Sequence, residues 1–189
     1  MSRERGFSLV ELMTVCVVLI IISAIAVPNI ARINASYKLD ASGHSVASLL
    51  QQARMQAVKT NQPAYAKYDN ATGMVYITSD PGLAYVAGNP DVAVSKGLTF
   101  NAAPPSFHGQ LDAYVGAGVW QIPDNIGFNA RGLPCIAVPG NPALCVSFPP
   151  KGFEWFIQNG SGGWVAVTVT PAGRIKTWRL NSTSAGTWQ

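Results

Sequence analysis

Residues 6–27 read GFSLVELMTVCVVLIIISAIAV, and this stretch decides how the chain is organised. The 21 residues from 7 to 27 would form a helix of about 32 Å, close to the roughly 30 Å hydrocarbon thickness of a bilayer. Arg3 and Arg5 precede the apolar run, so the positive-inside bias places its N-terminus in the cytoplasm. We therefore predict one membrane-spanning helix at the start of the chain, kinked or ended by Pro28.

Three simpler interpretations compete for this segment. A secretory signal peptide has the same layout, and Ala24-Ile25-Ala26 fits a small-x-small cleavage site. A plain membrane anchor and a hydrophobic core helix are the other two. None of them accounts for Glu11, because an unpaired carboxylate at the centre of a membrane costs on the order of 2.5–3.5 kcal/mol. We therefore expect a cation to meet Glu11.

Gly6-Phe7-Ser8-Leu9-Val10-Glu11-Leu12 resembles the class III signal of type IV prepilins and type II secretion pseudopilins. The resemblance implies that prepilin peptidase cleaves after Gly6, removing residues 1–6 as a leader, and methylates the new amino group of Phe7. It also implies that Glu11 pairs with the Phe7 amine of a neighbouring subunit. A buried carboxylate is tolerable when a cation neutralises it in this way.

The resemblance to prepilins and pseudopilins also implies which partners the chain has and where it is located. The partners are prepilin peptidase, other pilin subunits in a filament, and the bacterial inner membrane. The chain would cross that membrane once with its remainder in the periplasm, and would reach the pilus or cell surface after assembly.

An amphipathic pattern over residues 29–62 follows the apolar segment at 7–28. Apolar residues recur there at steps of three, four and seven, with cations off that stripe. The stripe consists of Leu39, Val46, Leu49, Leu50, Ala53 and Ala57. Asn61-Gln62-Pro63 ends the pattern. We expect one long helix whose first half lies in lipid or a filament core and whose second half packs beneath a globular head.

Residues 63–189, the expected head, change to the period of two that is typical of strands. The predicted strands are Ala64–Asp69, Met74–Ser79, Asn125–Asn129, Leu144–Phe148, Phe153–Gln158, Trp164–Thr170 and Arg174–Leu180, with short strands at 98–101 and 112–120. No helical pattern returns, so the expected fold class is α+β: a long N-terminal α-helix packed against an antiparallel β-sheet head, as in pilins.

Two segments of the head carry a narrower resemblance. Residues 126–132 (IGFNARG) and 165–175, which end in Pro171-Ala172-Gly173-Arg174-Ile175, resemble the paired signatures of the GspH/FimT-like minor pilin branch. Residues 80–124 resemble no family, and the order of their elements is not predicted.

Cys135 and Cys145 are separated by nine residues rich in Pro and Gly. Disulfides persist outside the cytoplasm, where the predicted topology places both residues. A disulfide closing this 11-residue loop would add roughly 2–3 kcal/mol of stability. Two buried free thiols are the alternative. Cys16, inside the apolar run, is expected to act as a small hydrophobic residue.

The chain offers little for an active site. His44 and His108 have no cysteine or paired carboxylate beside them, which disfavours a metal site. Gly116-Ala117-Gly118 is followed by Gln121 where a dinucleotide fingerprint needs glycine. We therefore predict no metal, no cofactor and no enzymatic activity.

The positive charge is concentrated near the C-terminus. The formal charge of the chain is +4, and residues 29–130 hold six cations and six carboxylates, which cancel. Residues 131–189 hold Arg131, Lys151, Arg174, Lys176 and Arg179 against Glu154 alone. Polyanions are the expected partners of such a surface.

The final predicted strand concentrates these cations. Arg174, Lys176 and Trp178 would share one face, with Ile175 and Arg179 on the other. If Ile175 faces the core, two cations and an indole face solvent, where the cations can follow phosphates and the indole can stack on a base. An edge strand that carries cations to discourage aggregation has the same pattern.

Gly173-Arg174-Ile175-Lys176 also resembles the Gly-Arg-x-Arg motif of DNA-binding minor pilins of natural transformation. Lysine in place of the second arginine keeps the charge and loses the planar fork. The resemblance implies DNA, duplex or single-stranded, as a partner of Arg174, Lys176, Trp178 and Arg179. The predicted function is a minor type IV pilin that binds DNA. The alternatives are a type II secretion minor pseudopilin and a pilus tip or priming subunit that binds no DNA.

Overall fold

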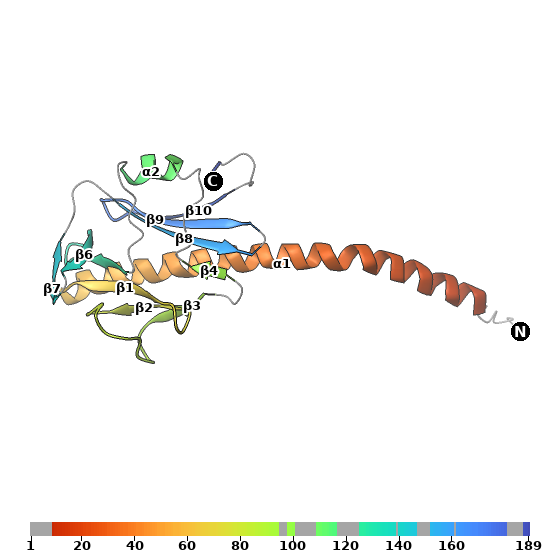
Figure 1. Cartoon of the computed structure of the whole chain (residues 1–189), viewed down its shortest axis with the longest axis horizontal. Helices are drawn as coiled ribbons and strands as arrows, with labels where there is room; N and C mark the ends of the chain where they lie inside the picture. The colour runs from red at the N-terminus through yellow and green to blue at the C-terminus, as the bar shows by residue number, and fades with distance from the viewer. Residues whose placement is uncertain are drawn as a thin grey trace, which may run out of the picture. The chain divides into compact units, whose positions relative to one another are not determined.

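The computed structural model describes residues 9–94, 98–100, 109–116, 125–138, 140–146, 152–160, 162–180 and 187–189. The chain divides into two compact units, Met1–Tyr37 and Lys38–Gln189. Helix α1 (Leu9–Thr60) begins in the first unit and continues into the second (Figure 1). Of the two effects predicted for Pro28, a kink or an end, the helix does not end there: it continues through this residue at the cost of one backbone hydrogen bond, as the expected single long helix requires.

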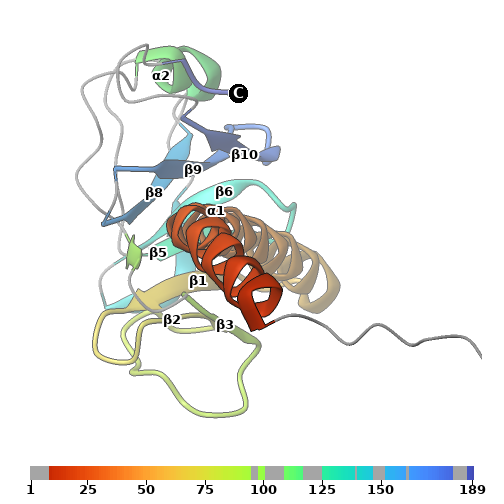
Figure 2. The ribbon, with the colours of Figure 1, turned by 90° about the vertical axis from the view of Figure 1, so that its right-hand side faces the viewer.

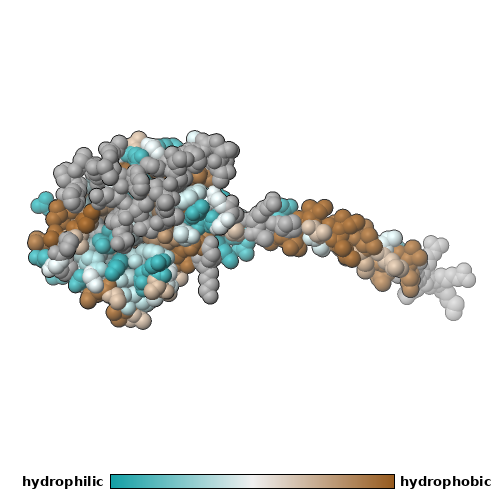
Figure 3. All heavy atoms as spheres, viewed as in Figure 1, coloured by the Kyte–Doolittle hydropathy of each residue, from teal (hydrophilic) through white to brown (hydrophobic). Residues whose placement is uncertain are grey.

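From Leu9 to Val27, α1 carries large apolar side chains on all sides. The stretch Leu9–Val27 is long and apolar enough to cross a membrane, and none of it is buried. Its large side chains stay exposed, from Val15 at 49% to Leu9 at 74%, and Figure 3 shows them covering this part of the helix. A helix that is apolar all round requires an apolar environment such as lipid or other helices.

In the second unit, α1 runs from Lys38 to Thr60. It ends where Asn61 adopts a left-handed conformation, with φ of 53°, which is a common way for a helix to stop. The apolar stripe predicted from Leu39 to Ala57 is buried along the whole of this stretch.

Two antiparallel sheets and a short second helix follow α1 in the second unit (Figures 1 and 2). The six-stranded sheet has the order β3-β2-β1-β5-β6-β7, and the four-stranded sheet has the order β10-β9-β8-β4. Their bounds are β1 (Ala64–Asp69), β2 (Met74–Thr78), β3 (Asp91–Ala93), β4 (Leu98–Phe100), β5 (Asn125–Phe128), β6 (Pro134–Val138), β7 (Asn141–Val146), β8 (Phe153–Asn159), β9 (Trp164–Val169) and β10 (Ile175–Arg179). The predicted α+β class with antiparallel pairing is confirmed.

The main core lies where α1 meets both sheets. Buried α1 residues such as Leu50 and Ala53 share one cluster with Ile126 of the six-stranded sheet and Trp155 and Val167 of the four-stranded sheet. Figure 2 shows α1 lying between the two sheets. The main core is therefore a helix in contact with two sheets instead of the single sheet that the sequence predicts.

Residues 112–120 were expected to form a strand, and this expectation is wrong for the part that the structure describes. Helix α2 (Gly109–Val115) occupies that place, so a helix does return after α1. Leu111 and Val115, four residues apart, are buried on one side of it. Seven residues make only about two turns, too few for a helical period to be recognised. Strands β3 and β6 were also missed.

A second, smaller core lies between α2 and the face of the four-stranded sheet that is turned away from α1. It combines Leu111 of α2 with Phe156, Ala166 and Trp178 of the sheet. Trp188, near the C-terminus, completes it: the backbone N–H of Trp188 donates to Gln110 Oε1 at 3.0 Å.

Candidate functional site

Glu11 lies in the first turn of α1, where a negative charge interacts favourably with the helix dipole. It is exposed, and its backbone carbonyl accepts a hydrogen bond from Thr14 Oγ1 at 2.8 Å. The predicted processing site, Gly6 and Phe7, lies outside the described residues.

The predicted disulfide is confirmed. Cys135 of β6 and Cys145 of β7 are bonded, with their Cα atoms 5.4 Å apart. The bond joins the two outermost strands at one edge of the six-stranded sheet. Cys16 is a free, exposed cysteine in the apolar part of α1.

Trp178 does not face solvent, so the predicted orientation of this residue is wrong. Its side chain is only 9% exposed. Nε1 donates to Thr168 Oγ1 at 2.9 Å, and the ring meets the Tyr114 ring edge-on with centroids 4.9 Å apart. β10 places the Trp178 side chain on the face of the sheet that is turned away from α1, but α2 covers that face. Trp178 therefore offers no open platform for a base.

The other three residues predicted to bind nucleic acid, in or beside β10, lie in different surroundings. Lys176 is exposed, and its Nζ lies 3.4 Å from the centroid of the Trp178 ring, a cation–π contact. Arg179 forms an ion pair with Asp40 of α1 at 2.6 Å. Arg174 precedes the strand in an exposed turn. Of the four residues predicted to bind nucleic acid, Arg174 and Lys176 are therefore exposed, Trp178 is buried and Arg179 is paired with a carboxylate.

The two segments that carry the branch resemblance form turns of the same kind. In Asn129–Leu133, the Asn129 side chain accepts hydrogen bonds from the backbone N–H groups of Arg131 and Leu133, at 2.9 and 3.1 Å. In Thr170–Arg174, the Thr170 hydroxyl accepts from the backbone N–H of Arg174 at 3.1 Å. The fourth residue of each turn is a glycine with φ of 73° (Gly132) or 78° (Gly173), a conformation that favours glycine.

Arg54 of α1 brings these turns together. Its Nη1 donates to the carbonyl of Gly173 at 2.8 Å. A Cβ placed on Gly132 would lie 3.1 Å from Arg54 Nε, and a Cβ on Gly173 would lie 2.7 Å from the Gly132 carbonyl oxygen. Sequence reasoning missed Arg54, because a cation beside an apolar helical stripe has the pattern of a solvated surface residue.

Glu154 of β8 is a fully buried carboxyl group on the α2 side of the sheet. Within the described residues, neither of its carboxyl oxygens has a hydrogen-bond partner. Burial, reinforced by the nearby charge of Asp112, raises the pKa of Glu154 to about 8. The group is therefore protonated in the folded protein at neutral pH.

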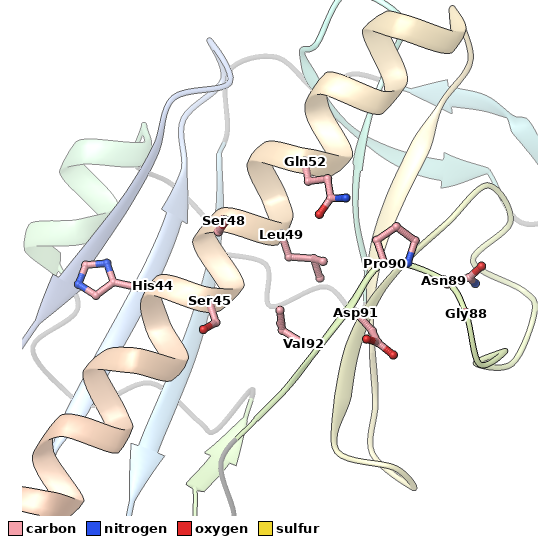
Figure 4. A pocket seen from close by; sticks show the side chains of 10 residues that line it. All are labelled: His44, Ser45, Ser48, Leu49, Gln52, Gly88, Asn89, Pro90, Asp91 and Val92. Atoms are coloured by element: carbon pink, nitrogen blue, oxygen red, sulfur yellow. The ribbon is translucent and has the colours of Figure 1, made fainter.

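A cavity of about 670 Å³ lies between α1 and residues 88–92 (Figure 4). Ser45, Ser48 and Gln52 line the helix side, and Asp91 on the other side accepts a hydrogen bond from the Tyr85 hydroxyl. Among the residues that the structure places, no three His, Cys, Asp or Glu side chains come together to hold a metal ion. The cavity shows no arrangement that identifies a ligand.

Comparison with known proteins decides the nature of the N-terminus. Residues 1–27 match the family described as Prokaryotic N-terminal methylation motif. The chain therefore carries a prokaryotic N-terminal methylation motif. The resemblance predicted from Gly6 to Leu12 is thereby confirmed. No curated protein sequence matches the chain.

Solved structures to which this chain is similar include a type IV minor pilin and a minor pseudopilin. The type IV minor pilin FimU of Pseudomonas aeruginosa aligns with a TM-score of 0.47 and 17% identity, over 75% of this chain and 88% of its own. A second crystal form of FimU gives 0.46 and 18%, over 74% and 91%. The minor pseudopilin EpsH of the Vibrio cholerae type 2 secretion system gives 0.44 and 11%, over 77% and 99%.

Proposed function

We propose that this chain is a minor subunit of the type IV pilin and pseudopilin class, anchored in the inner membrane and assembled into a filament. The methylation motif over residues 1–27 carries this proposal. The apolar surface of α1 from Leu9 to Val27 supports it, because such a surface must be covered by lipid before assembly and by other helices afterwards. The second unit would lie in the periplasm.

In this function the chain is the substrate of an enzyme. Prepilin peptidase would cut after Gly6 and methylate the Phe7 amine. Glu11 would then meet the Phe7 amine of a neighbouring subunit, which neutralises a carboxylate that costs free energy in an apolar surrounding. This pair of charges would fix the register between the helices of neighbouring subunits.

Mass spectrometry of the full-length protein extracted from membranes tests the processing step. We expect N-methylated Phe7 as the first residue, and an intact N-terminus in cells that lack prepilin peptidase. A mature protein that begins at Met1 or at Val27 would exclude the prepilin interpretation.

Substitution of Glu11 tests the assembly step. Glu11→Val should leave membrane insertion and cleavage intact but strongly reduce incorporation into filaments, because the Phe7 amine loses its partner. Glu11→Asp, which keeps the charge, is the matched control and should retain more incorporation. Equal incorporation of Glu11→Val and wild type would show that the pairing is not needed.

We further propose that the second unit binds DNA, as a minor pilin of natural transformation does. The excess positive charge of residues 131–189 and the exposure of Arg174 and Lys176 support this proposal. The alternatives are a pilus tip or priming subunit and a type II secretion pseudopilin. Deletion of the gene separates the three functions. A DNA-binding minor pilin predicts loss of DNA uptake alone, a tip or priming subunit predicts loss of pili, and a pseudopilin predicts loss of protein secretion.

A further inference from the structure

A group of cations from three separate elements meets at one corner of the second unit. The turn Asn129–Leu133 brings Arg131, the turn Thr170–Arg174 brings Arg174, and α1 brings Arg54. We name this place the two-turn corner. We propose that nucleic-acid phosphates bind at the two-turn corner, with Arg131 and Arg174 as the contacts, and not along the face of β10. This inference rests on the proposed DNA function and names the surface that performs it.

The backbone places Arg131 and Arg174 close together. A Cβ on Gly173 would come within 2.7 Å of the Gly132 carbonyl oxygen, so the two turns touch at these glycines. Arg131 directly precedes Gly132, and Arg174 directly follows Gly173, each only about 3.8 Å away along the chain. Both arginine side chains are exposed. Two long cationic side chains on touching turns can reach neighbouring phosphates of one strand.

The turns are held in place before any ligand binds. Asn129 Oδ1 accepts two backbone hydrogen bonds within its own turn. The backbone N–H of Thr170 donates to the Arg174 carbonyl at 2.9 Å, and that of Gly173 donates to the Thr170 carbonyl at 2.7 Å. A preorganised site loses less conformational entropy on binding.

Arg54 has two effects at the corner. Its hydrogen bond to the Gly173 carbonyl ties the second turn to α1. Its guanidinium is half-buried beneath both turns, where its charge is screened less than that of a solvated side chain and adds to the positive potential outside. Arg54 is therefore a positioning residue, whereas Arg131 and Arg174 are the contact residues.

The face of β10 is a poorer surface for a polyanion. Lys176 lies over the buried Trp178 ring, and Arg179 is neutralised by Asp40. Within the described residues, neither Arg131 nor Arg174 is paired with a carboxylate. Among the described cations in and beside β10, Arg174 is therefore the one with neither a ring nor a carboxylate against it, and Arg131 lies on the turn that touches its own.

Binding of the full-length protein in detergent micelles to labelled duplex DNA, measured at graded salt, tests this inference. The variants are Arg131→Gln, Arg174→Gln, their combination, and Lys176→Gln. Lys38→Gln is the matched control: it removes an exposed cation 16 residues before Arg54, about 24 Å away along the same helix.

We expect the slope of log K against log salt to shrink by roughly 0.9 for each of Arg131 and Arg174, equivalent to about an eight-fold loss of affinity per contact near 0.1 M salt. Lys176→Gln and Lys38→Gln should keep the wild-type slope. Arg54→Lys, which keeps the charge but not the fork, should reduce affinity with little change in slope.

Each other outcome has a definite meaning. If Lys176→Gln reduces the slope as Arg174→Gln does, and Arg131→Gln does not, phosphates follow the strand and the corner is refuted. If Arg131→Gln/Arg174→Gln binds DNA normally but fails to enter filaments, the corner contacts another subunit. If the wild-type protein binds no DNA at any salt, the proposed DNA function itself fails.

Discussion

The two faces of the four-stranded sheet are both buried, but they differ in what they bury. The face on α1 presents aliphatic and aromatic side chains such as Trp155, Val165 and Val167. The face on α2 includes Glu154 and Thr168, both fully buried, beside Trp178. Alternation along a strand therefore establishes which residues share a face, but not whether that face meets solvent.

The largest expected effect comes from the α1 face. Trp155 is fully buried and packs edge-on against Phe100, with ring centroids 5.2 Å apart. Trp155→Ala should lower the free energy of unfolding by about 3–5 kcal/mol. Trp178→Ala should cost about half as much, because its smaller cluster is closed by a seven-residue helix. Urea unfolding followed by circular dichroism measures both, and equal losses would contradict the difference between the faces.

The buried carboxyl group on the α2 face makes stability depend on pH. Folding raises the pKa of Glu154 from 4.5 to about 8, so between these values the folded state holds a proton that the unfolded state releases. The stabilising effect is complete below the unfolded pKa and is lost as the pH rises through about 8. We expect the free energy of unfolding to fall by on the order of 3 kcal/mol. The fall cannot exceed the free energy needed to move α2 away from the sheet, because that local opening would expose the ionised carboxylate to water.

Glu154→Gln, which is neutral at every pH, is the variant that sharpens this test. Its free energy of unfolding should change little between about pH 5 and about pH 9 where that of the wild type falls. Parallel pH profiles for the two proteins would mean that Glu154 is not the titrating group.

A smaller effect is expected from the hydrogen bond between the Trp178 Nε1 and the Thr168 hydroxyl. Thr168→Val keeps the shape but removes the acceptor, and should cost about 1–2 kcal/mol because a buried donor loses its partner. Thr168→Ser keeps the oxygen and serves as the control. Should Thr168→Val unfold at the same urea concentration as the wild type, the polar groups of the α2 face contribute nothing to its stability.

The smallest effect is expected at the rim of the α1 face, where Arg179 pairs with Asp40. Both side chains keep solvent contact, at 50% and 28% exposure. Exposed pairs contribute little, so Arg179→Gln should cost at most about 1 kcal/mol. A double-mutant cycle with Asp40→Asn isolates the pair, and a coupling well above that value would show that the rim is more strongly shielded from solvent.

The sequence predicted the elements that have a strong periodic pattern. β1 was predicted with its observed bounds, and the buried stripe of α1 from Leu39 to Ala57 was predicted residue by residue. The disulfide was predictable because only Cys135 and Cys145 lie outside the apolar run. These features depend on local spacing, which the sequence displays directly.

The features that were missed depend on contacts between distant parts of the chain. α2 is short and lies in a stretch rich in Gly, Pro and Asn, so nothing signalled that it would cover Trp178. The strand pattern of β10 was correct and Arg174 and Lys176 are exposed as predicted, but the exposure inferred for Trp178 was wrong. Arg54 and Gly173 are 119 residues apart, and no local pattern relates them.

The meeting of Arg54 with two glycines also constrains how this protein can vary. A side chain at Gly132 or Gly173 would enter space held by Arg54 or by the opposite turn. A shorter residue at position 54 would remove the Arg54 contacts, but the positive φ of both glycines and the contact of Gly173 with the Gly132 carbonyl would remain. Both glycines should therefore be retained even where position 54 varies, and a pairwise mutational scan of the three positions should show that shortening residue 54 does not rescue a side chain at Gly173.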